Sequence, residues 1–457
     1  MNILFIHQNF PAQYKSISVY MAQRGHSVTA LGEAPLLAQR GRLPGIQTLG
    51  YPTPPSAGKD THFYLHTTEG GVNRGLAVAR GLLGLRQKGY EPDIICAHPG
   101  WGEALFLRDV FPNTPQLLFS EFYFKAQEAD LSFDPEFPYS MDWTFSVRIR
   151  NSAQLISLSE ADGCMSPTGW QLSRYPEFVQ KMARVIHDGI DCSLMFPDED
   201  SLTIQPLNIP GESRIVGDMR PEAGTPEHNV RGDAESVGPD TVHADGPYTA
   251  PAFILTGKDK VITFISRNLE PYRGYHVFTR ALPEIQKNNP DAHILIVGAD
   301  GASYSPNPPP DTTYKAMFLD EVRDKIDLSR IHFLGRISYL ALRALFRISS
   351  AHVYLTYPFV LSWSMLEAMA CESLIIGSRT APVEEVIEDG KNGLLVDFFD
   401  ANTLVQRITE ACNNPSAFIS IRKEARQTVL KRFELNSCLL QQMDLIQHVT
   451  SLRRKKS

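Results

Sequence analysis

The stretch KVITFISRNLEPYRG occupies residues 260–274 and opens on a largely apolar run, Lys260–Ser266. A short apolar run bounded by polar and turn-forming residues predicts a buried β-strand. The residues that follow, Gly274–Lys287, carry apolar side chains at helical spacing and predict a helix. A buried strand that passes through a short loop into a helix is typical of a βαβ unit, whose strands form a parallel sheet.

The same alternation continues through the second half of the chain. Further strands are predicted at His293–Val297, Ile331–Leu334, His352–Thr356, Leu374–Gly377 and Gly393–Val396. Further helices are predicted at Tyr314–Ile326, Tyr339–Ile348, Ser364–Cys371, Ala401–Cys412, Pro415–Arg432 and Leu435–Val449. Strands and helices in strict alternation predict a doubly wound α/β domain.

The first half of the chain repeats this organisation. Its predicted strands are Asn2–His7, Ser27–Leu31, Asp93–Ala97, Gln116–Ser120 and Gln154–Leu158, with helices between them such as Val72–Lys88. We therefore expect two α/β domains with doubly wound parallel sheets, over residues 1–196 and 257–432. Ligands of such sheets bind beyond the carboxyl ends of the strands, so we expect the two domains to face a cleft that holds the site.

The segment between the two domains has a different composition. Residues 197–256 are rich in proline, glycine and acidic side chains, and no aromatic residue occurs between Phe196 and Tyr248. Such a segment buries too little apolar surface to offset the entropy lost on ordering. We expect a linker over 197–256 with a flexible insertion at 208–247. Residues 433–457 are expected to form a C-terminal helix and a basic tail, and the proline-rich Tyr304–Thr313 an extended loop.

Composition excludes several classes of protein. The net charge of −7 at pH 7 offers no basic field for nucleic acid. The six cysteines include no C-x-x-C pair, no run of 18 apolar residues occurs, and the N-terminus resembles no signal peptide. We therefore expect a cytoplasmic protein. Two interpretations of the tail Arg453–Lys456 stay open, a solvated end and peripheral contact with an anionic membrane.

Charged side chains at two places indicate chemistry. Arg267 and Arg273 flank the loop that follows the strand Lys260–Ser266, next to a predicted helix N-terminus. Two cations and a helix N-terminus would bind a diphosphate, although arginines in such loops are often only surface charges. Glu367 lies in an apolar helix, where burying an unpaired carboxylate is costly. It is interpreted either as a solvated helix residue or as an acceptor of two hydrogen bonds from a ribose diol.

These residues carry a resemblance to a known family. The stretches Ser266–Asp300, Leu334–Asp397, Val185–Asp191 and Asn9–Gln13 resemble the family 4 glycosyltransferases. The resemblance implies the GT-B fold of two Rossmann-like domains and a retaining, metal-independent transfer of a hexose-type sugar. It implies a nucleoside diphosphate sugar as co-substrate, no further cofactor, and a saccharide or lipid-linked acceptor at the inner membrane face.

The resemblance also implies roles for individual residues. Arg267 and Arg273 match the basic pair that holds the donor diphosphate, with the backbone of Ser364 and Met365 facing the phosphates. Glu367 matches the second glutamate of the family's E-x7-E motif and implies a ribose contact. Gly335 and Arg336 fall where the family's loop lines the nucleobase.

Several positions depart from the family pattern. The first glutamate of E-x7-E is replaced by Phe359, so the orientation of the donor sugar is open. Glu372 and Ala12 stand where glycine is common, and a left-handed helix end at Glu372 would be strained. No D-x-D triad occurs in a convincing loop at a strand end, in agreement with an expected absence of metal.

The first domain is expected to hold the acceptor. His98 follows the predicted strand Asp93–Ala97, and Glu121 follows Gln116–Ser120. In the family a histidine or acid near this place helps to position or activate the acceptor, so both are candidate catalytic residues. The alternative is that each is a structural loop residue bonded to the backbone.

The expected function is thus a retaining glycosyltransferase of polysaccharide or glycoconjugate synthesis. Two alternatives stay open. Phe359 favours a nucleotide-sugar-binding protein with impaired catalysis, and the fold also suits a sugar-nucleotide epimerase. A phosphorylase would require a pyridoxal-binding lysine, for which the sequence offers no persuasive candidate.

Overall fold

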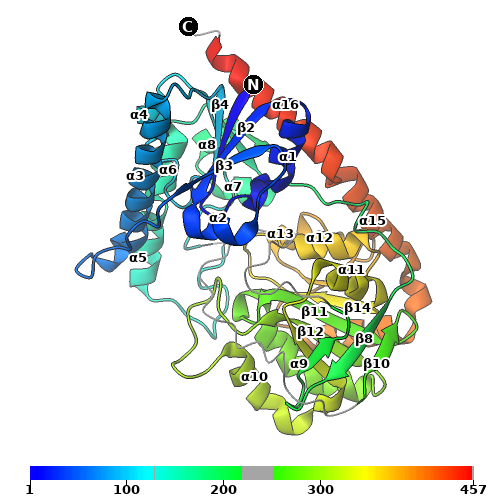
Figure 1. Ribbon diagram of the computed structural model, residues 1–457. Helices are drawn as coiled ribbons and strands as arrows, with labels where there is room; N and C mark the ends of the chain where they lie inside the picture. Colours follow the sequence, from blue (N-terminus) through cyan, green and yellow to red (C-terminus); the bar gives the residue numbers. More distant parts are fainter. Residues whose placement is uncertain (128, 219–250, 455–457) are drawn as a thin grey trace. The chain divides into compact units, whose positions relative to one another are not determined.

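The computed structural model describes residues 1–127, 129–218 and 251–454 (Figure 1). These residues form two compact units. The first contains Met1–Gly189 together with the C-terminal helix α16 (Leu435–Arg454), and the second contains the described residues from Ile190 to Glu434. Among the described residues no helix is both long and apolar enough to cross a membrane.

The first unit is built on a parallel sheet. Within its described residues seven strands pair in the order β3-β2-β1-β4-β5-β6-β7. Their bounds are β1 Asn2–Ile6, β2 Ser27–Glu33, β3 Ile46–Tyr51, β4 Ile94–Ala97, β5 Gln116–Phe119, β6 Gly163–Ser166 and β7 Ala183–Val185. The order runs outward in both directions from β1 and β4, which makes the loops after these two strands the switch point where ligands of such sheets bind.

Helices cover both faces of this sheet, because its strands are apolar on both sides. Ile3 and Phe5 of β1 pack with α1 and α16, whereas Leu4 and Ile6 pack with α3, α4 and α6. In Figure 1 these two groups of helices lie on opposite sides of the sheet. The helices of the unit are α1 Lys15–Gln23, α2 Ala34–Arg40, α3 His66–Gln87, α4 Leu107–Val110, α5 Met141–Arg150, α6 Ser152–Ser159, α7 Gly169–Arg174, α8 Glu177–Met182 and α16.

The second unit contains a second parallel sheet. Within its described residues six strands pair in the order β13-β12-β11-β14-β15-β16. Their bounds are β11 Val261–Asn268, β12 His293–Ala299, β13 Ile331–Gly335, β14 Ala351–Tyr354, β15 Ile375–Ser378 and β16 Leu394–Val396. The predicted doubly wound α/β architecture is therefore present in both units.

Two groups of helices pack on this second sheet. Side chains of α11, α12, α13 and α15 share one buried cluster with β12 and β15. On β11, Phe264 stacks on Phe278 of α9, and α9 in turn contacts α10 and α14. The helices are α9 Tyr275–Asn288, α10 Tyr314–Val322, α11 Tyr339–Ile348, α12 Trp363–Ala370, α13 Ala381–Glu384, α14 Ala401–Asn413 and α15 Ile419–Arg432.

The segment 197–256 differs from the predicted linker. Its described residues contain β8 (Ser201–Pro206), β9 (Ser213–Ile215) and β10 (Phe253–Thr256), which form an antiparallel sheet in the order β10-β8-β9. Leu202, Ile204, Ile215 and Leu255 are buried in the core of the second unit, so apolar burial holds these strands in place. Of the predicted flexible insertion 208–247, residues 219–247 lie outside the described residues.

Two further predictions differ from the structure. Residues Gln154–Leu158 belong to α6 and form no strand. A short apolar run cannot be assigned to strand or helix by periodicity alone, and here Ser157 bonds to the Ala153 carbonyl one helical turn back, at 2.9 Å. The C-terminal helix predicted within 433–457 is present as α16, but it is not a part by itself, since Leu439, Ile446 and Val449 are buried in the core of the first unit.

Candidate donor and acceptor sites

Arg273 is positioned by the turn between β11 and α9. Gly274, at the start of α9, has φ of 70°, and a Cβ atom there would lie 2.3 Å from Cβ of Leu355. Only glycine fits this left-handed, crowded position, so the turn that carries Arg273 is specified by sequence. The Arg273 side chain is buried, and its Nη1 donates to Thr356 Oγ1 at 2.8 Å and to the Val360 carbonyl at 3.1 Å.

The predicted donor-binding residues come together at one edge of the second sheet. Arg267 lies near the end of β11 and is half-buried, and Gly335 ends β13 with the exposed Arg336 next to it. Ser364 and Met365 lie in the first turn of α12, which follows β14. Since the carboxyl ends of parallel strands lie at the same edge, all these residues share the edge where a ligand is expected.

Glu367 is a buried carboxylate on α12. Its residue is 1% exposed, so the interpretation as a solvated helix residue is wrong. The Tyr339 hydroxyl, at the start of α11, donates to Glu367 Oε1 at 2.9 Å. At the start of α12, the helix that carries Glu367, Ser362 Oγ accepts the backbone N–H of Ser364 at 3.3 Å and so caps the helix. A helix N-terminus and a buried acceptor of hydroxyl donors therefore lie on one short helix.

Phe359 is surrounded by other aromatic rings. Its ring centroid lies 4.7 Å from that of Tyr304 and 5.5 Å from that of Tyr272, and the residue is 6% exposed.

The two other departures from the family pattern place a residue with a side chain where the backbone is left-handed. Glu372 has φ of 58° and Ala12 has φ of 40°, so both adopt the left-handed region that glycine tolerates best.

The structure brings the two predicted acceptor residues together in the first unit. His98 follows β4 and Glu121 follows β5, the neighbouring strand, and His98 Nε2 lies 3.2 Å from Glu121 Oε2. Gly100 donates its N–H to His98 Nδ1 at 3.1 Å, so in the neutral ring the proton is on Nε2, where it bonds Glu121. Gln13 Nε2 donates to the other Glu121 oxygen at 3.0 Å.

Two buried residues beside this pair were missed by the sequence analysis. His7 is fully buried, its ring centroid lies 5.3 Å from that of His98, and burial lowers its pKa well below 6.5. Glu103 is also fully buried, accepts the N–H of Gln8 at 2.9 Å, and has its pKa raised by burial. Both offered a signal in the sequence, since His7 ends the first predicted strand and Glu103 stands in the loop that follows the predicted strand Asp93–Ala97.

Orphaned polar atoms mark the same edge of the first sheet. Among the described residues, His7 Nε2, Glu103 Oε2 and Trp101 Nε1 are buried without a hydrogen-bond partner. Buried polar atoms rarely stay unpaired, so a polar ligand or water is expected to satisfy them. The arrangement is suited to binding the hydroxyl groups of an acceptor.

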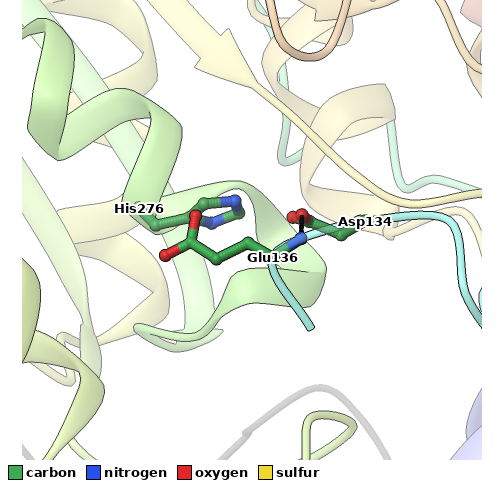
Figure 2. A group of neighbouring side chains, drawn as sticks. All are labelled: Asp134, Glu136 and His276. Carbon is green, nitrogen blue, oxygen red and sulfur yellow. Dashed lines mark hydrogen bonds between the residues drawn. The ribbon is translucent and has the colours of Figure 1, made fainter. Parts of the chain in front are cut away.

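Other polar groups lie apart from the predicted sites. A pocket of about 510 Å³ on the second unit is lined by charged residues such as Arg379, Glu388 and Lys431, and by none of the predicted site residues. In the first unit the Asp134 carboxylate accepts the N–H of Glu136 at 2.9 Å (Figure 2). His276, labelled in the same view, belongs to α9 of the second unit, where its ring packs on Phe318 and Phe398.

Two family models match successive parts of the chain. The model described as "Glycosyl transferase family 4 group" matches residues 24–195, and that described as "Glycosyl transferases group 1" matches residues 250–428. Together the two matches include most of the chain.

Relatives with curated names match shorter stretches. A D-inositol 3-phosphate glycosyltransferase of Corynebacterium glutamicum is 28% identical over 138 residues, 30% of this chain and 31% of the relative. A phosphatidyl-myo-inositol mannosyltransferase of Mycolicibacterium smegmatis is 29% identical over 181 residues, 37% and 42% of the two chains. An uncharacterised glycosyltransferase of Methanocaldococcus jannaschii is 28% identical over 116 residues, 25% and 33%. The matched region spans between 31% and 42% of these relatives.

Solved structures match over the whole chain. Sucrose-phosphate synthase from Thermosynechococcus elongatus has a TM-score of 0.66 at 15% identity and covers 99% of both chains. HepE of Anabaena, solved in complex with UDP and glucose, has a TM-score of 0.59 at 16% identity and covers 98% of this chain and 100% of its own. At these identities the likeness shows the fold, and it confirms the predicted GT-B fold.

Proposed function

The chain belongs to the family 4 glycosyltransferases, and on this premise we propose that it transfers a sugar from a nucleoside diphosphate sugar to a hydroxyl group in glycoconjugate synthesis. The observation that carries the proposal is the buried Glu367 carboxylate, bonded by Tyr339, at the sheet edge that also holds Arg273. A carboxylate has room for several hydrogen bonds, and the hydroxyls of a ribose are donors of the same kind as the Tyr339 hydroxyl that bonds Glu367.

The donor diphosphate is assigned to Arg267, Arg273 and the N-terminal amides of α12 at Ser364 and Met365. Fixed cations and helix amides stabilise the charge that develops on the leaving diphosphate. Gly335 and Arg336 are assigned to the nucleobase. HepE was solved with UDP and glucose, so UDP-glucose is the first donor to test.

The finer features of the reaction rest on family membership. We propose a hexosyltransferase that retains the anomeric configuration and works without metal, because the two arginines supply positive charge where a divalent cation would otherwise act. We propose no cofactor besides the donor. Proton NMR of the product would give its anomeric configuration, and activity that survives EDTA would support independence from metal.

The acceptor is assigned to the first unit. His98 and Glu121 are proposed to orient and activate the acceptor hydroxyl, because their hydrogen bond fixes the imidazole and because His98 follows β4, at the switch point, while Glu121 follows the neighbouring strand β5. A saccharide or lipid-linked acceptor fits the names of relatives that act on inositol phosphate and phosphatidyl-myo-inositol. Peripheral contact with the inner membrane face is part of this proposal, although residues 455–457 of the tail lie outside the described part of the chain.

The test begins with the donor. Thermal shift with UDP-, GDP- and ADP-sugars is measured for the wild type, for Arg273→Ala and for Arg323→Ala, a control that removes a surface arginine paired with Asp320. We expect one base to raise the melting temperature of wild type and control but not of Arg273→Ala. No shift with any of these would contradict the donor site. Binding without turnover would identify an impaired enzyme, and conversion of the donor sugar alone would identify an epimerase.

A further inference from the structure

Phe359 stands where the family pattern has a glutamate, and its ring contacts Tyr304 in the loop that follows β12. We propose that Glu270 and Tyr304 are positioning residues that, together with Phe359, fix the Arg273 guanidinium for the donor diphosphate. We call Tyr304 and Phe359 the aromatic bracket. This inference rests on the proposed function, because it deepens the assignment of Arg273 to the diphosphate.

Glu270 anchors the loop that carries Tyr304. Its side chain is fully buried, and Oε2 accepts the backbone N–H groups of Ser303, Tyr304 and Ser305 at 3.0, 3.0 and 2.8 Å. Burial raises the pKa of Glu270, whereas the three backbone N–H groups and the Arg273 guanidinium act to lower it. When the carboxyl group is ionised, its hydrogen bonds are about twice as strong as neutral ones. They give a loop without helix or strand a defined backbone position at Tyr304.

The aromatic bracket lies against the cation. The Arg273 guanidinium carbon is 5.4 Å from the ring centroid of Tyr304 and 5.9 Å from that of Phe359. Both distances lie within the range of cation–π attraction, which favours Arg because its flat head is weakly hydrated. The rings of the bracket contact each other with centroids 4.7 Å apart, so each restrains the other.

Hydrogen bonds hold the guanidinium at one nitrogen. Nη1 donates to Thr356 and to the Val360 carbonyl, as described above. The cation is thus fixed by hydrogen bonds and by ring faces, and none of these partners is an anion. Phe359 offers Arg273 a ring face and no charge of its own. A charge that is fixed in advance loses little entropy on binding a diphosphate.

The position of Glu270 supports a role beyond packing. Among the described residues its Oε1 has no hydrogen-bond partner, so the buried acid is retained at an energetic cost. This unpaired oxygen lies beside the loop of Tyr304, next to the proposed diphosphate site. The same acid is three residues from Arg273, so a single turn carries both the anchor of the bracket and the cation that the bracket contacts.

The experiment compares two ligands that differ only in the diphosphate. Calorimetry or NMR titration gives the affinity of full-length protein for UDP and for uridine, or for GDP or ADP and their nucleosides if thermal shift selects another base. The variants are Tyr304→Leu, Tyr304→Phe, Glu270→Gln and Arg273→Ala. Phe253→Leu is the control, since it removes a ring that packs on His293 and His332 of the same unit.

We expect Tyr304→Leu and Glu270→Gln to lower the affinity for UDP about tenfold and that for uridine less than twofold. Tyr304→Phe keeps the ring and is expected to match the wild type, as is Phe253→Leu. Equal losses for UDP and uridine would show a merely structural role and overturn the inference. Should Tyr304→Leu fail to fold, Glu270→Gln decides by the same comparison, the loss of affinity for UDP against the loss of affinity for uridine.

The variant Arg273→Ala distinguishes a failure of this inference from a failure of the proposed function on which it rests. If Arg273→Ala loses UDP binding while Tyr304→Leu and Glu270→Gln keep it, the bracket does not position the cation and only this inference fails. If Arg273→Ala binds UDP as tightly as the wild type, the diphosphate assignment fails and the inference falls with it.

Discussion

Tyr339 and Glu367 join two helices of the second unit at the proposed ribose site, where the Tyr339 hydroxyl donates to the buried carboxylate at 2.9 Å. Tyr339 begins α11 and Glu367 lies inside α12, so the bond connects the helices that follow β13 and β14. It orients one carboxylate oxygen and leaves the group able to accept further hydrogen bonds from a ligand.

Glu367→Gln is therefore expected to raise the KM for the donor by about tenfold or more, because the amide accepts hydrogen bonds less strongly than the carboxylate. Tyr339→Phe is expected to raise it about threefold by leaving the carboxylate less well oriented. Steady-state kinetics with varied donor would measure both. Tyr64→Phe, which removes a hydroxyl bonded to exposed Asp142, is the control. Unchanged KM in Glu367→Gln would refute the ribose assignment.

Arg273→Lys is expected to lower kcat/KM at least tenfold although the charge is kept. A lysine ammonium could donate to Thr356 and Val360 as Nη1 does, but it has no flat guanidinium face to lie against the rings of Tyr304 and Phe359. The measurement is kcat/KM for the donor, with Arg323→Lys as a matched surface control. A lysine variant as active as the wild type would mean that charge alone is required there.

Glu121→Gln is expected to lower kcat by about 10- to 100-fold while the KM for the donor changes little. The amide can no longer act as a base or carry charge beside His98 Nε2, 3.2 Å away, and donor contacts are assigned to the other unit. Glu160→Gln, at an exposed acid beside Arg108, is the control. Unaltered kcat would leave Glu121 as a structural loop residue.

Glu372→Gly is expected to stabilise the protein by about 0.5 to 1 kcal/mol, because a non-glycine residue at φ of 58° is strained. Part of the gain is offset by the greater freedom of glycine in the unfolded chain. Glu372→Ala removes the same charge and keeps the strain, so it is expected to give no gain. Denaturation midpoints of the three proteins would decide, and equal gains in both variants would assign the effect to charge.

Acid is expected to destabilise the second unit through buried His352, whose pKa is lowered by burial to about 3. The ordinary value is about 6.5, so between these values the unfolded chain binds a proton that the folded one does not. The contribution of neutral His352 to the free energy of unfolding is fully present above pH 6.5. It falls as the pH drops, by about 2 to 3 kcal/mol at pH 4.5. Denaturation midpoints against pH should fall less steeply in His352→Asn than in wild type or in the exposed-site control His448→Asn. Parallel curves would refute this.

Much of the fold could be predicted because it is written in local patterns. A strand as apolar as Lys260–Ser266 is buried on both faces. The helix that follows it directly can cover one face and return the chain to a parallel neighbouring strand, which predicts a parallel sheet. The candidate donor residues were found for the same reason, since they stand in loops that directly follow predicted strands. Their roles as ligands stay predictions.

Local sequence patterns could not predict which distant segments pair or pack with one another. Nothing near Ser201–Pro206 indicates that its partners are Ser213–Ile215 and Phe253–Thr256, and Gln154–Leu158 has the same apolar character as a strand. The same limit applied to α16, whose apolar face could have packed on either unit and is buried in the first.

The sequence by itself determined that this protein has two α/β domains with parallel sheets and that candidate site residues such as Arg267, His98 and Glu121 stand at or just after strand ends, because periodicity and loop position are properties of neighbouring residues. Only the tertiary structure decided that Glu121 bonds His98, that Glu270 holds the loop of Tyr304, and that Arg273 meets aromatic rings. These relationships join residues from different strands and loops, and which side chains meet there depends on strand order and packing, which no single segment encodes.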